Sequence, residues 1–371
     1  MTGLRIAVLA NLKDNAPEIP GASSDVWDDL DSMTTINHIL DALRAGGHTA
    51  EFFEASIAPE FDLSGQLRSF QPDLCFNIAE GHWGDGREAQ IPSLLEMLRI
   101  PYTGSGVLSL ALALDKPMTK RVLSYHNLPT PEFQVFGQWD GAIDDDLLNE
   151  TGELRFPMFV KPSREGTGIG VHAKSVVHSV SELRTAVRSL QKKYQQPILA
   201  ERFISGREVT VGVLGNLKKT SARRLNERTP PHVMPEELTL FPAMEINTES
   251  YPTEGGIYTN RVKVELVHDF YWTCPAKLTA EMDEQLKMLT AAVFRVMGCY
   301  DVARVDFRID DEGQPFILEI NPLPGLNSEY SDLCIEARAM GWTYEQLING
   351  IVDCAAVRYH LRNDVSVEQP H

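Results

Sequence analysis

The chain lacks the sequence features of a membrane-spanning or disulfide-stabilised protein. No stretch approaches the roughly 20 apolar residues of a spanning helix. The first apolar run, "LRIAVLAN", is too short for a signal peptide. No CxxC pair occurs among the scattered cysteines, which are Cys75, Cys274, Cys299, Cys334 and Cys354. We therefore expect reduced, mostly buried thiols and a cytoplasmic protein with no membrane partner.

Positive charge is scarce. The 34 Lys and Arg residues face 52 Asp and Glu residues, for a formal net charge of −18. A nucleic-acid partner would require a basic face, so this balance argues against one. Anionic small ligands remain compatible, because a local basic pocket can lie within an acidic field.

Two common nucleotide-binding signatures are also absent. Neither the Walker A pattern nor the dinucleotide-binding GxGxxG pattern occurs. The stretch "VKPSREGTGIGV" instead combines Lys161 with a glycine-bearing loop. Backbone N–H groups of such a loop can cradle a phosphate, and the lysine adds a point charge. A plain tight turn is the competing interpretation.

The order of the predicted elements indicates an α/β protein. "LRIAVLAN" is typical of a buried strand, and helical spacing of apolar residues follows over 33–45, ending at Gly46-Gly47. Further strands are expected at "TAEFFEA" and "DLCFNIAEG", which predicts a parallel sheet. A returning strand is expected after the glycine-bearing loop, and an irregular insertion over 216–256. At 371 residues, two or three domains are expected.

The stretch "RVDFRIDDEGQPFILEINPLPG" predicts a hairpin that carries unusual polar residues. Glu319 and Asn321 are two residues apart, so they share a strand face, and Asp306 can join them from the partner strand. Two carboxylates and an amide suit Mg²⁺, with Mn²⁺ as an alternative. Arg304 lies on the same face as Asp306 and can neutralise a phosphate or an oxyanion. A solvent-facing strand surface is the competing interpretation.

Other candidates stand at element ends. "DKPMTK" places Lys116 at a helix start, and "ILAERFISGREVTV" places Glu201 and Glu208 in strands. "GHWGDGREAQ" follows a strand of the parallel sheet, where α/β proteins bind ligands. There Arg87 could bind a substrate carboxylate, with His82 and Trp83 lining the same pocket. Solvated surface residues and a helix-capping loop are the alternatives.

These motifs occur in an order that resembles one family. "PYTGSG", "LDKPMTK", "FVKPSREGTGIGV", "LAERFISGREVTV", "RVKVE", "CPA", "ARVDFRID" and "LEINPLPGL" together resemble an ATP-grasp enzyme of the D-alanine–D-alanine ligase type. The resemblance implies three α/β domains, with ATP between the second and the third. We place them at 1–104 (N-terminal substrate-binding), 105–200 (central) and 201–371 (C-terminal, with the insertion). It also implies that a homodimer is plausible.

The resemblance implies a nucleotide site. The residues that match phosphate-side lysines of the family are Lys116, Lys161 and Lys263. Glu201 resembles the residue near the adenine amine, Phe203 lies beside the base, and Glu208 resembles the ribose-binding acid.

The resemblance also implies a reaction. A carboxylate attacks the γ-phosphate of ATP, and an amine then displaces phosphate from the acyl phosphate. Asp306, Glu319 and Asn321 resemble the magnesium ligands, and Arg304 and the backbone of Gly325 resemble the groups that stabilise the tetrahedral intermediate.

The substrate side departs from the family pattern. The usual His-Gly pair is Glu80-Gly81, the loop serine is Thr167, and the loop tyrosine falls at Val264. A glutamate would attract a cationic amine. The loop over 10–31 is long and acidic, with Asp28 as a weak match to the amine-binding glutamate. The carboxylate-holding serine falls near Tyr330-Ser331.

The resulting hypothesis is an ATP- and magnesium-dependent ligase that forms an amide between amino acids or small peptides, on a substrate other than D-alanine. The alternatives are a genuine D-alanine–D-alanine ligase, a kinase-like phosphotransferase that uses the same site, and a non-catalytic nucleotide-binding relative. Fold-level likeness alone does not decide among them.

Overall fold

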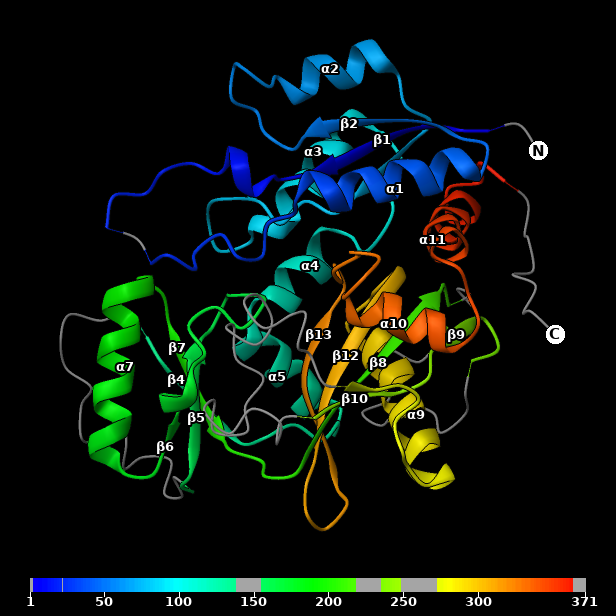
Figure 1. The fold of residues 1–371 in the computed structure, drawn as a ribbon. Helices are drawn as coiled ribbons and strands as arrows, with labels where there is room; N and C mark the ends of the chain where they lie inside the picture. The colour runs from blue at the N-terminus through cyan, green and yellow to red at the C-terminus, as the bar shows by residue number, and fades with distance from the viewer. Residues whose placement is uncertain (1–2, 22, 138–154, 218–234, 248–271, 363–371) are drawn as a thin grey trace.

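The computed structural model describes residues 3–21, 23–137, 155–217, 235–247 and 272–362. Three sheets organise them, and Figure 1 shows one at the top of the molecule and two side by side below. The described structure is therefore of the α/β class, as the sequence predicts. Among these residues, no helix combines the length and apolar composition needed to cross a bilayer.

The N-terminal sheet is parallel, with strand order β2-β1-β3. Its strands are β1 (Arg5–Ala10), β2 (Thr49–Glu54) and β3 (Leu74–Asn77). Its helices are α1 (Met33–Ala45), α2 (Leu63–Phe70) and α3 (Gln90–Leu98). The parallel arrangement brings the loops that follow β1 and β3 to the same edge of the sheet.

The central sheet is antiparallel, with order β4-β7-β5-β6. Its elements are β4 (Phe133–Phe136), β5 (Met158–Pro162), β6 (Val176–Val177), β7 (Ile198–Arg202) and the covering helix α7 (Val180–Tyr194). No returning strand directly follows the glycine-bearing loop; residues 163–172 form turns, and the two-residue β6 pairs with β5 instead. Since β7 pairs with β4 and β5, the central unit reaches Arg202.

The third sheet has six strands, in the order β11-β10-β8-β12-β13, with β9 paired to β8. They are β8 (Arg207–Gly215), β9 (Leu238–Leu240), β10 (Met244–Ile246), β11 (Trp272–Thr273), β12 (Asp301–Ile309) and β13 (Pro315–Asn321). Its helices are α9 (Ala280–Val296), α10 (Asp332–Ala339) and α11 (Tyr344–Arg358). The predicted 216–256 insertion was wrong as a wholly irregular segment, because β9 and β10 join this sheet. The stretch "RVKVE", over 261–265, lies outside the described residues.

Helices α4 (Val107–Leu114) and α5 (Lys116–Tyr125) connect the N-terminal sheet to the other two, and Figure 1 shows them between the sheets. The sequence "VLSLALAL" of α4 is apolar almost all round, so it carries no helical period. The pattern analysis therefore missed α4, although α5 was expected. It also missed the short helix α2, where Leu63, Leu67 and Phe70 do follow helical spacing.

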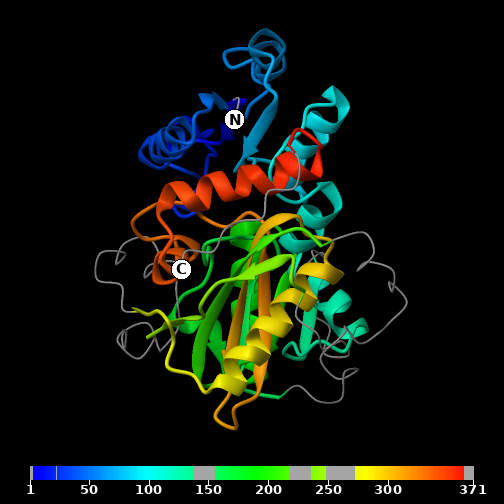
Figure 2. The same cartoon turned by 90° about the vertical axis from the view of Figure 1, so that its right-hand side faces the viewer.

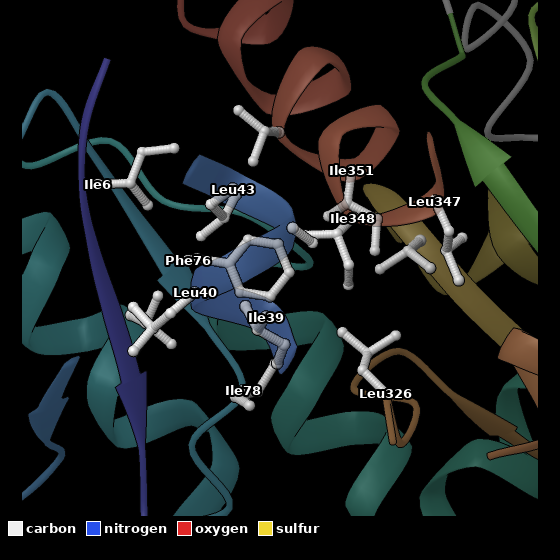
Figure 3. Packing of buried hydrophobic residues seen from close by; sticks show 14 of the residues in the cluster. Ile6, Ile39, Leu40, Leu43, Phe76, Ile78, Leu326, Leu347, Ile348 and Ile351 are labelled. Atoms are coloured by element: carbon white, nitrogen blue, oxygen red, sulfur yellow. The ribbon is translucent and has the colours of Figure 1, made fainter. Parts of the chain in front are cut away.

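One apolar core joins the two ends of the chain. In Figure 3, Phe76 of β3 lies between Ile39 and Leu43 of α1 and the side chains of α11, including Ile348 and Ile351. Figure 2 shows α11 running across the molecule between the N-terminal sheet and the third sheet. The last helix therefore closes the core of the first domain.

A buried carboxylate reinforces this junction. Asp301, at the start of β12, has no solvent exposure and adopts a left-handed φ of 62°. Its carboxylate accepts hydrogen bonds from Gly104 N (2.8 Å), Asn216 Nδ2 (2.7 Å) and the Arg358 guanidinium (2.7 Å). One side chain thus connects the N-terminal domain, the end of β8 and α11.

We expect Asp301→Asn to lower the free energy of unfolding by about 3 kcal/mol, since removing one partner leaves the buried Arg358 charge uncompensated. Asparagine tolerates the left-handed backbone, so the charge is the main change. Urea unfolding of the ligand-free protein measures the effect. The control is Asp41→Asn, whose ion pair with Arg44 is exposed and contributes little. Equal midpoints for both variants would contradict the assignment.

Candidate active site

Two connected cavities lie where the three sheets meet. The larger cavity, of about 360 Å³, is formed by the loops after β1 and β3, the glycine-bearing loop and the segment 319–332. The smaller cavity, of about 90 Å³, lies between the central and third sheets. Lys116, Glu165 and Glu319 line both cavities, so a ligand in one can reach a ligand in the other at these residues.

Strand register brings the predicted metal-ligand residues together. Asp306 of β12 lies opposite Glu319 of β13, and Arg304 lies opposite Asn321. The Asp306 carboxylate accepts hydrogen bonds from Asn321 Nδ2 (2.9 Å) and Thr210 Oγ1 (2.7 Å), while Glu319 lies 3.3 Å from Lys116 Nζ. Two carboxylates and an amide on one face have the hard oxygen atoms that Mg²⁺ prefers. No group of three or more His, Cys, Asp or Glu side chains suited to a metal occurs in the described part of the chain, so this fit rests on those three residues and water or ligand oxygens.

Arg304 is held in its charged form next to this face. Its Nε donates to Asp306 (2.9 Å), and its Nη1 lies 3.5 Å from Asp332. Burial by itself would lower the pKa of Arg304, but the Asp306 and Asp332 carboxylates raise it well above its ordinary value. The guanidinium lines the larger cavity, together with Gly325, Tyr330 and Ser331.

Gly325 approaches the start of α10 closely. A Cβ at this position would lie 3.0 Å from Ser331 Oγ, which itself accepts a hydrogen bond from Asn327 N (2.9 Å). The absence of a side chain leaves the backbone of residue 325 accessible to the cavity. Both members of the predicted Arg304 and Gly325 pair therefore face the same space.

The smaller cavity contains a buried arrangement of one carboxylate and two lysines. Glu201 lies 2.8 Å from Lys161 and 2.6 Å from Lys120, which is fully buried. Burial would raise the pKa of Glu201, but the two lysine charges lower it. Glu201 thus fixes Lys161 at the cavity wall. Lys120 was missed, although its spacing of four residues from Lys116 on one helix was visible in "DKPMTK".

Aromatic side chains flank the other end of the smaller cavity. Phe159 and Phe203 stack with ring centroids 6.4 Å apart and an interplanar angle of 27°. Glu208 also lines this cavity and accepts a hydrogen bond from Arg308 Nη2 (3.0 Å). Arg308, which sequence reasoning missed, lies over the Phe203 ring at 5.4 Å. A flat base and a hydroxyl-bearing sugar are the kinds of group this end can accept.

The glycine-bearing loop separates the two cavities. Thr167, with a left-handed φ of 48°, lines the larger cavity, and Gly168 lines the smaller one. Lys116 Nζ donates to the carbonyl of Glu165 at 2.5 Å. The acidic N-terminal loop reaches this segment, since Asp25 accepts hydrogen bonds from Gly170 N (3.3 Å) and Tyr194 Oη (2.8 Å).

Arg87, which we expected to bind a substrate carboxylate, is instead paired within the protein. Its guanidinium pairs with Asp29 (2.7 Å) and Glu165 (3.4 Å), donates to the Arg164 carbonyl (2.7 Å), and lines neither cavity. These internal partners satisfy it, so we remove Arg87 from the substrate-binding set. His82 and Trp83 also line neither cavity; both rings make edge contacts with Trp27.

Glu80 and Asp28 do line the larger cavity. Gly81 positions Glu80: its φ is +73°, and a Cβ there would lie 2.5 Å from the Arg87 carbonyl oxygen. Asp28 pairs with Lys13 at 2.5 Å. Two further acids of this wall, Asp31 and Glu88, were not singled out in the sequence, although Asp31 belongs to the acid-rich loop. Lys263 and Val264 lie outside the described residues.

The surroundings of several of these carboxyls disfavour their ionised form and raise their pKa values. Burial raises the pKa of Glu88 to about 7, with Arg87 opposing the shift and Asp29 adding to it. Burial and the Asp29 charge raise the pKa of Asp31 to about 7. Burial, with the charges of Glu88 and Asp29, also raises the pKa of Glu80 well above its ordinary value. Burial thus outweighs the nearby positive charge of Arg87 at Glu80 and Glu88.

We expect Glu88→Gln to stabilise the ligand-free protein at pH 8 by roughly 1–3 kcal/mol. Between the ordinary pKa of 4.5 and the folded value of about 7, the folded state binds more protons than the unfolded state, so wild-type stability falls as pH rises. The variant should not lose stability in this way as pH rises, and at pH 5 the two proteins should have similar free energies of unfolding. Urea midpoints at pH 5 and 8 measure it, with the exposed Glu51→Gln as control. Parallel pH dependences in wild type and Glu88→Gln would refute this account.

Comparison with known proteins identifies the family. Residues 122–353 match the family model described as D-ala D-ala ligase C-terminus. An uncharacterised protein of Sinorhizobium fredii is 36% identical over 86% of this chain and 87% of its own length. A D-alanine–D-alanine ligase of Bordetella avium is 31% identical over 86% of this chain and 88% of its own length.

Structural comparison agrees on the fold. The D-alanine–D-alanine ligase of Bacillus anthracis, solved in complex with ATP, superposes with a TM-score of 0.67 at 21% identity, covering 98% of this chain and 100% of that one. The arrangement of the three sheets is thus the ATP-grasp fold. The chain belongs to the D-alanine–D-alanine ligase family and is an ATP-grasp ligase that forms C–N bonds.

Proposed function

We propose that this protein uses ATP and Mg²⁺ to join the carboxylate of one amino acid or small peptide to the amine of another. The observation that carries the proposal is the position of Glu319. It lies opposite Asp306 on the hairpin, contacts Lys116, and lines both cavities. A nucleotide in the smaller cavity and an acid in the larger one would meet at this residue.

The smaller cavity suits the nucleotide. Phe159 and Phe203 offer apolar faces to a base, and Glu208 offers a hydrogen-bond acceptor to a ribose hydroxyl. Lys161 and Lys116 supply positive charge for the phosphates. Glu201 contributes by holding Lys161 rather than by standing free as an adenine partner. Lys263 remains part of this proposal on the family resemblance.

Asp306, Glu319 and Asn321 would hold Mg²⁺. When bound, the ion neutralises phosphate charge and aligns the γ-phosphate for attack. The acid substrate's carboxylate oxygen attacks the γ-phosphorus, breaking the bond to the bridging oxygen and releasing ADP. Lys116 faces this junction and compensates the charge of the transferring group.

The second step takes place in the larger cavity. An amine attacks the acyl carbon, and phosphate leaves as the amide bond forms. The Arg304 guanidinium and the backbone of Gly325 both face this space, where they can stabilise the negative oxygen of the tetrahedral intermediate. The loop bearing Thr167 separates the cavities and can exclude water from the acyl phosphate.

The substrate pair is proposed to differ from two D-alanines. By the family resemblance, Glu80 stands where a histidine is usual, and several other carboxylates line the same cavity. Tyr330 and Ser331 line the same cavity, where an amine-bearing substrate's carboxylate can bind. The competing activities are D-alanine–D-alanine ligation, as named for the Bordetella avium relative, and phosphoryl transfer without amide formation.

The direct test is ADP release with ATP and Mg²⁺ over a panel of D- and L-amino acids, their pairs and short peptides, with products identified by mass. We expect ADP release in step with an amide product for a pair other than D-alanine with itself. A D-alanine dimer as the best product would refute the altered substrate. A phosphorylated product without any amide would establish phosphotransfer instead.

We expect Glu319→Gln to reduce magnesium-dependent ADP release by about 100-fold or more, because the loss of one anionic ligand weakens metal binding where phosphate charge develops. The matched control is Glu312→Gln, an exposed residue in the turn of the same hairpin. Steady-state ADP release at several Mg²⁺ concentrations measures both. A normal rate in Glu319→Gln would exclude it as a metal ligand.

A further inference from the structure

The charges that line the larger cavity do not balance. Three cationic side chains of the described residues line it, and they are Lys13, Lys116 and Arg304. Eight carboxylates do so, and they are Asp28, Asp29, Asp31, Glu80, Glu88, Glu165, Glu319 and Asp332. The cavity is large enough for small-molecule ligands, so we ask which ligand this excess of carboxylates would bind.

Ion pairs satisfy five of the eight. Asp28 pairs with Lys13, Glu319 with Lys116, and Asp332 with Arg304. Asp29 and Glu165 share Arg87, which approaches from behind the wall. These five carboxylates thus have internal partners and do not call for a ligand.

The remaining three are Asp31, Glu80 and Glu88. Among the described residues, no cationic side chain lies within ion-pair distance of these three acids. Their side chains also form no hydrogen bond with another described residue. Glu88 is only 8% exposed and faces the cavity. Burying an unpaired carboxylate costs free energy. Its presence in a ligand cavity therefore indicates that the ligand brings the cationic partner.

The backbone holds these acids in place. Asn11, just beyond β1, is 1% exposed; its carbonyl accepts from Asp31 N (3.1 Å), and its Oδ1 accepts from Gly81 N (2.8 Å). Glu88 follows Arg87, whose carbonyl packs against Gly81. One buried residue, Asn11, thus aligns both segments, with its backbone carbonyl bound to the segment of Asp31 and its side chain bound to that of Glu80. The acids form a built wall rather than a chance grouping on a mobile surface.

The missing partner is better matched by an organic cation than by a metal ion. No described group of three or more acidic, His or Cys side chains has the closeness that a metal ion demands. An ammonium or guanidinium presents several N–H donors at hydrogen-bond distance and can reach separate carboxylates. One α-ammonium needs a single carboxylate, whereas this wall offers three.

Resting on the proposed function, we propose that one of the two substrates is a basic amino acid, whose side-chain ammonium or guanidinium binds the wall formed by Asp31, Glu80 and Glu88. Its carboxylate then points toward Arg304 and Lys116, which line the same cavity. The raised pKa values of the three carboxyls agree with this arrangement, because an arriving cation favours their ionised forms.

The experiment compares basic amino acids with neutral analogues of the same shape. Each of lysine, ornithine and arginine, in both stereochemical forms, is paired with norleucine, norvaline or citrulline as its neutral counterpart, in the presence of a shared panel of second amino acids. ADP release and amide mass are measured. We expect kcat/KM at least tenfold higher for the basic member, as one charge-assisted hydrogen bond provides.

Variants connect the preference to the wall. Glu80→Gln and Glu88→Gln should each raise KM for the basic amino acid about tenfold while leaving KM for ATP near the wild-type value. The exposed Glu51→Gln should keep the wild-type preference. Should either glutamine variant fold poorly, Asp31→Asn tests the same wall from the loop after β1.

The outcomes are distinguishable from failure of the proposed function. If neutral amino acids give amide and ADP as efficiently as basic ones, the ligase activity stands and this inference is refuted. An unchanged preference in Glu80→Gln and Glu88→Gln refutes the assignment of the wall. If no amino acid or peptide stimulates ADP release, the proposed function fails, and this inference fails with it.

Discussion

The position of Asp301 is the constraint on which the shared site depends. Its carboxylate is buried at the start of β12 and binds groups from the N-terminal domain, from the end of β8 and from α11. Because β12 continues from this anchor to Arg304 and Asp306, the same strand that joins the domains also carries the reactive face. The apolar core between α1 and α11 then keeps the acidic loops close to that face. The contacts that join the domains therefore also fix the position of the strand that carries the site.

The pairing of charged side chains differs between the two cavities. At the smaller one, Lys161 pairs with Glu201 and lines the cavity, where it can meet a phosphate. Among the described residues that line the larger one, carboxylates outnumber cations and three carboxylates form no ion pair. Such an arrangement costs stability in the ligand-free protein, and binding of a complementary ligand offsets that cost. We propose that the smaller cavity binds the nucleotide as the family resemblance implies, and that the acidic lining of the larger cavity selects the substrate.

Much of the fold and of the nucleotide half could be read from the sequence. Alternation on the hairpin placed Asp306, Glu319 and Asn321 on one face, because the strand period is two. Helical spacing located α1, but the all-apolar α4 carried no period. Arg87 was misassigned because a loop arginine can reach a ligand or a neighbouring acid, and only the packing of Asp29 against it decides which.

What the sequence by itself determined is therefore local: element types, strand faces, the excess of acid, and the motifs that reveal the family. Tertiary structure alone decided which charges meet. Asn11 and Asp31 are distant in sequence from Gly81 and Glu88 and share no motif with them, yet the parallel sheet brings the loops after β1 and β3 to one edge. The physical reason is that a charge is neutralised by whatever lies within a few ångströms, and that distance is set by domain packing rather than by neighbours along the chain.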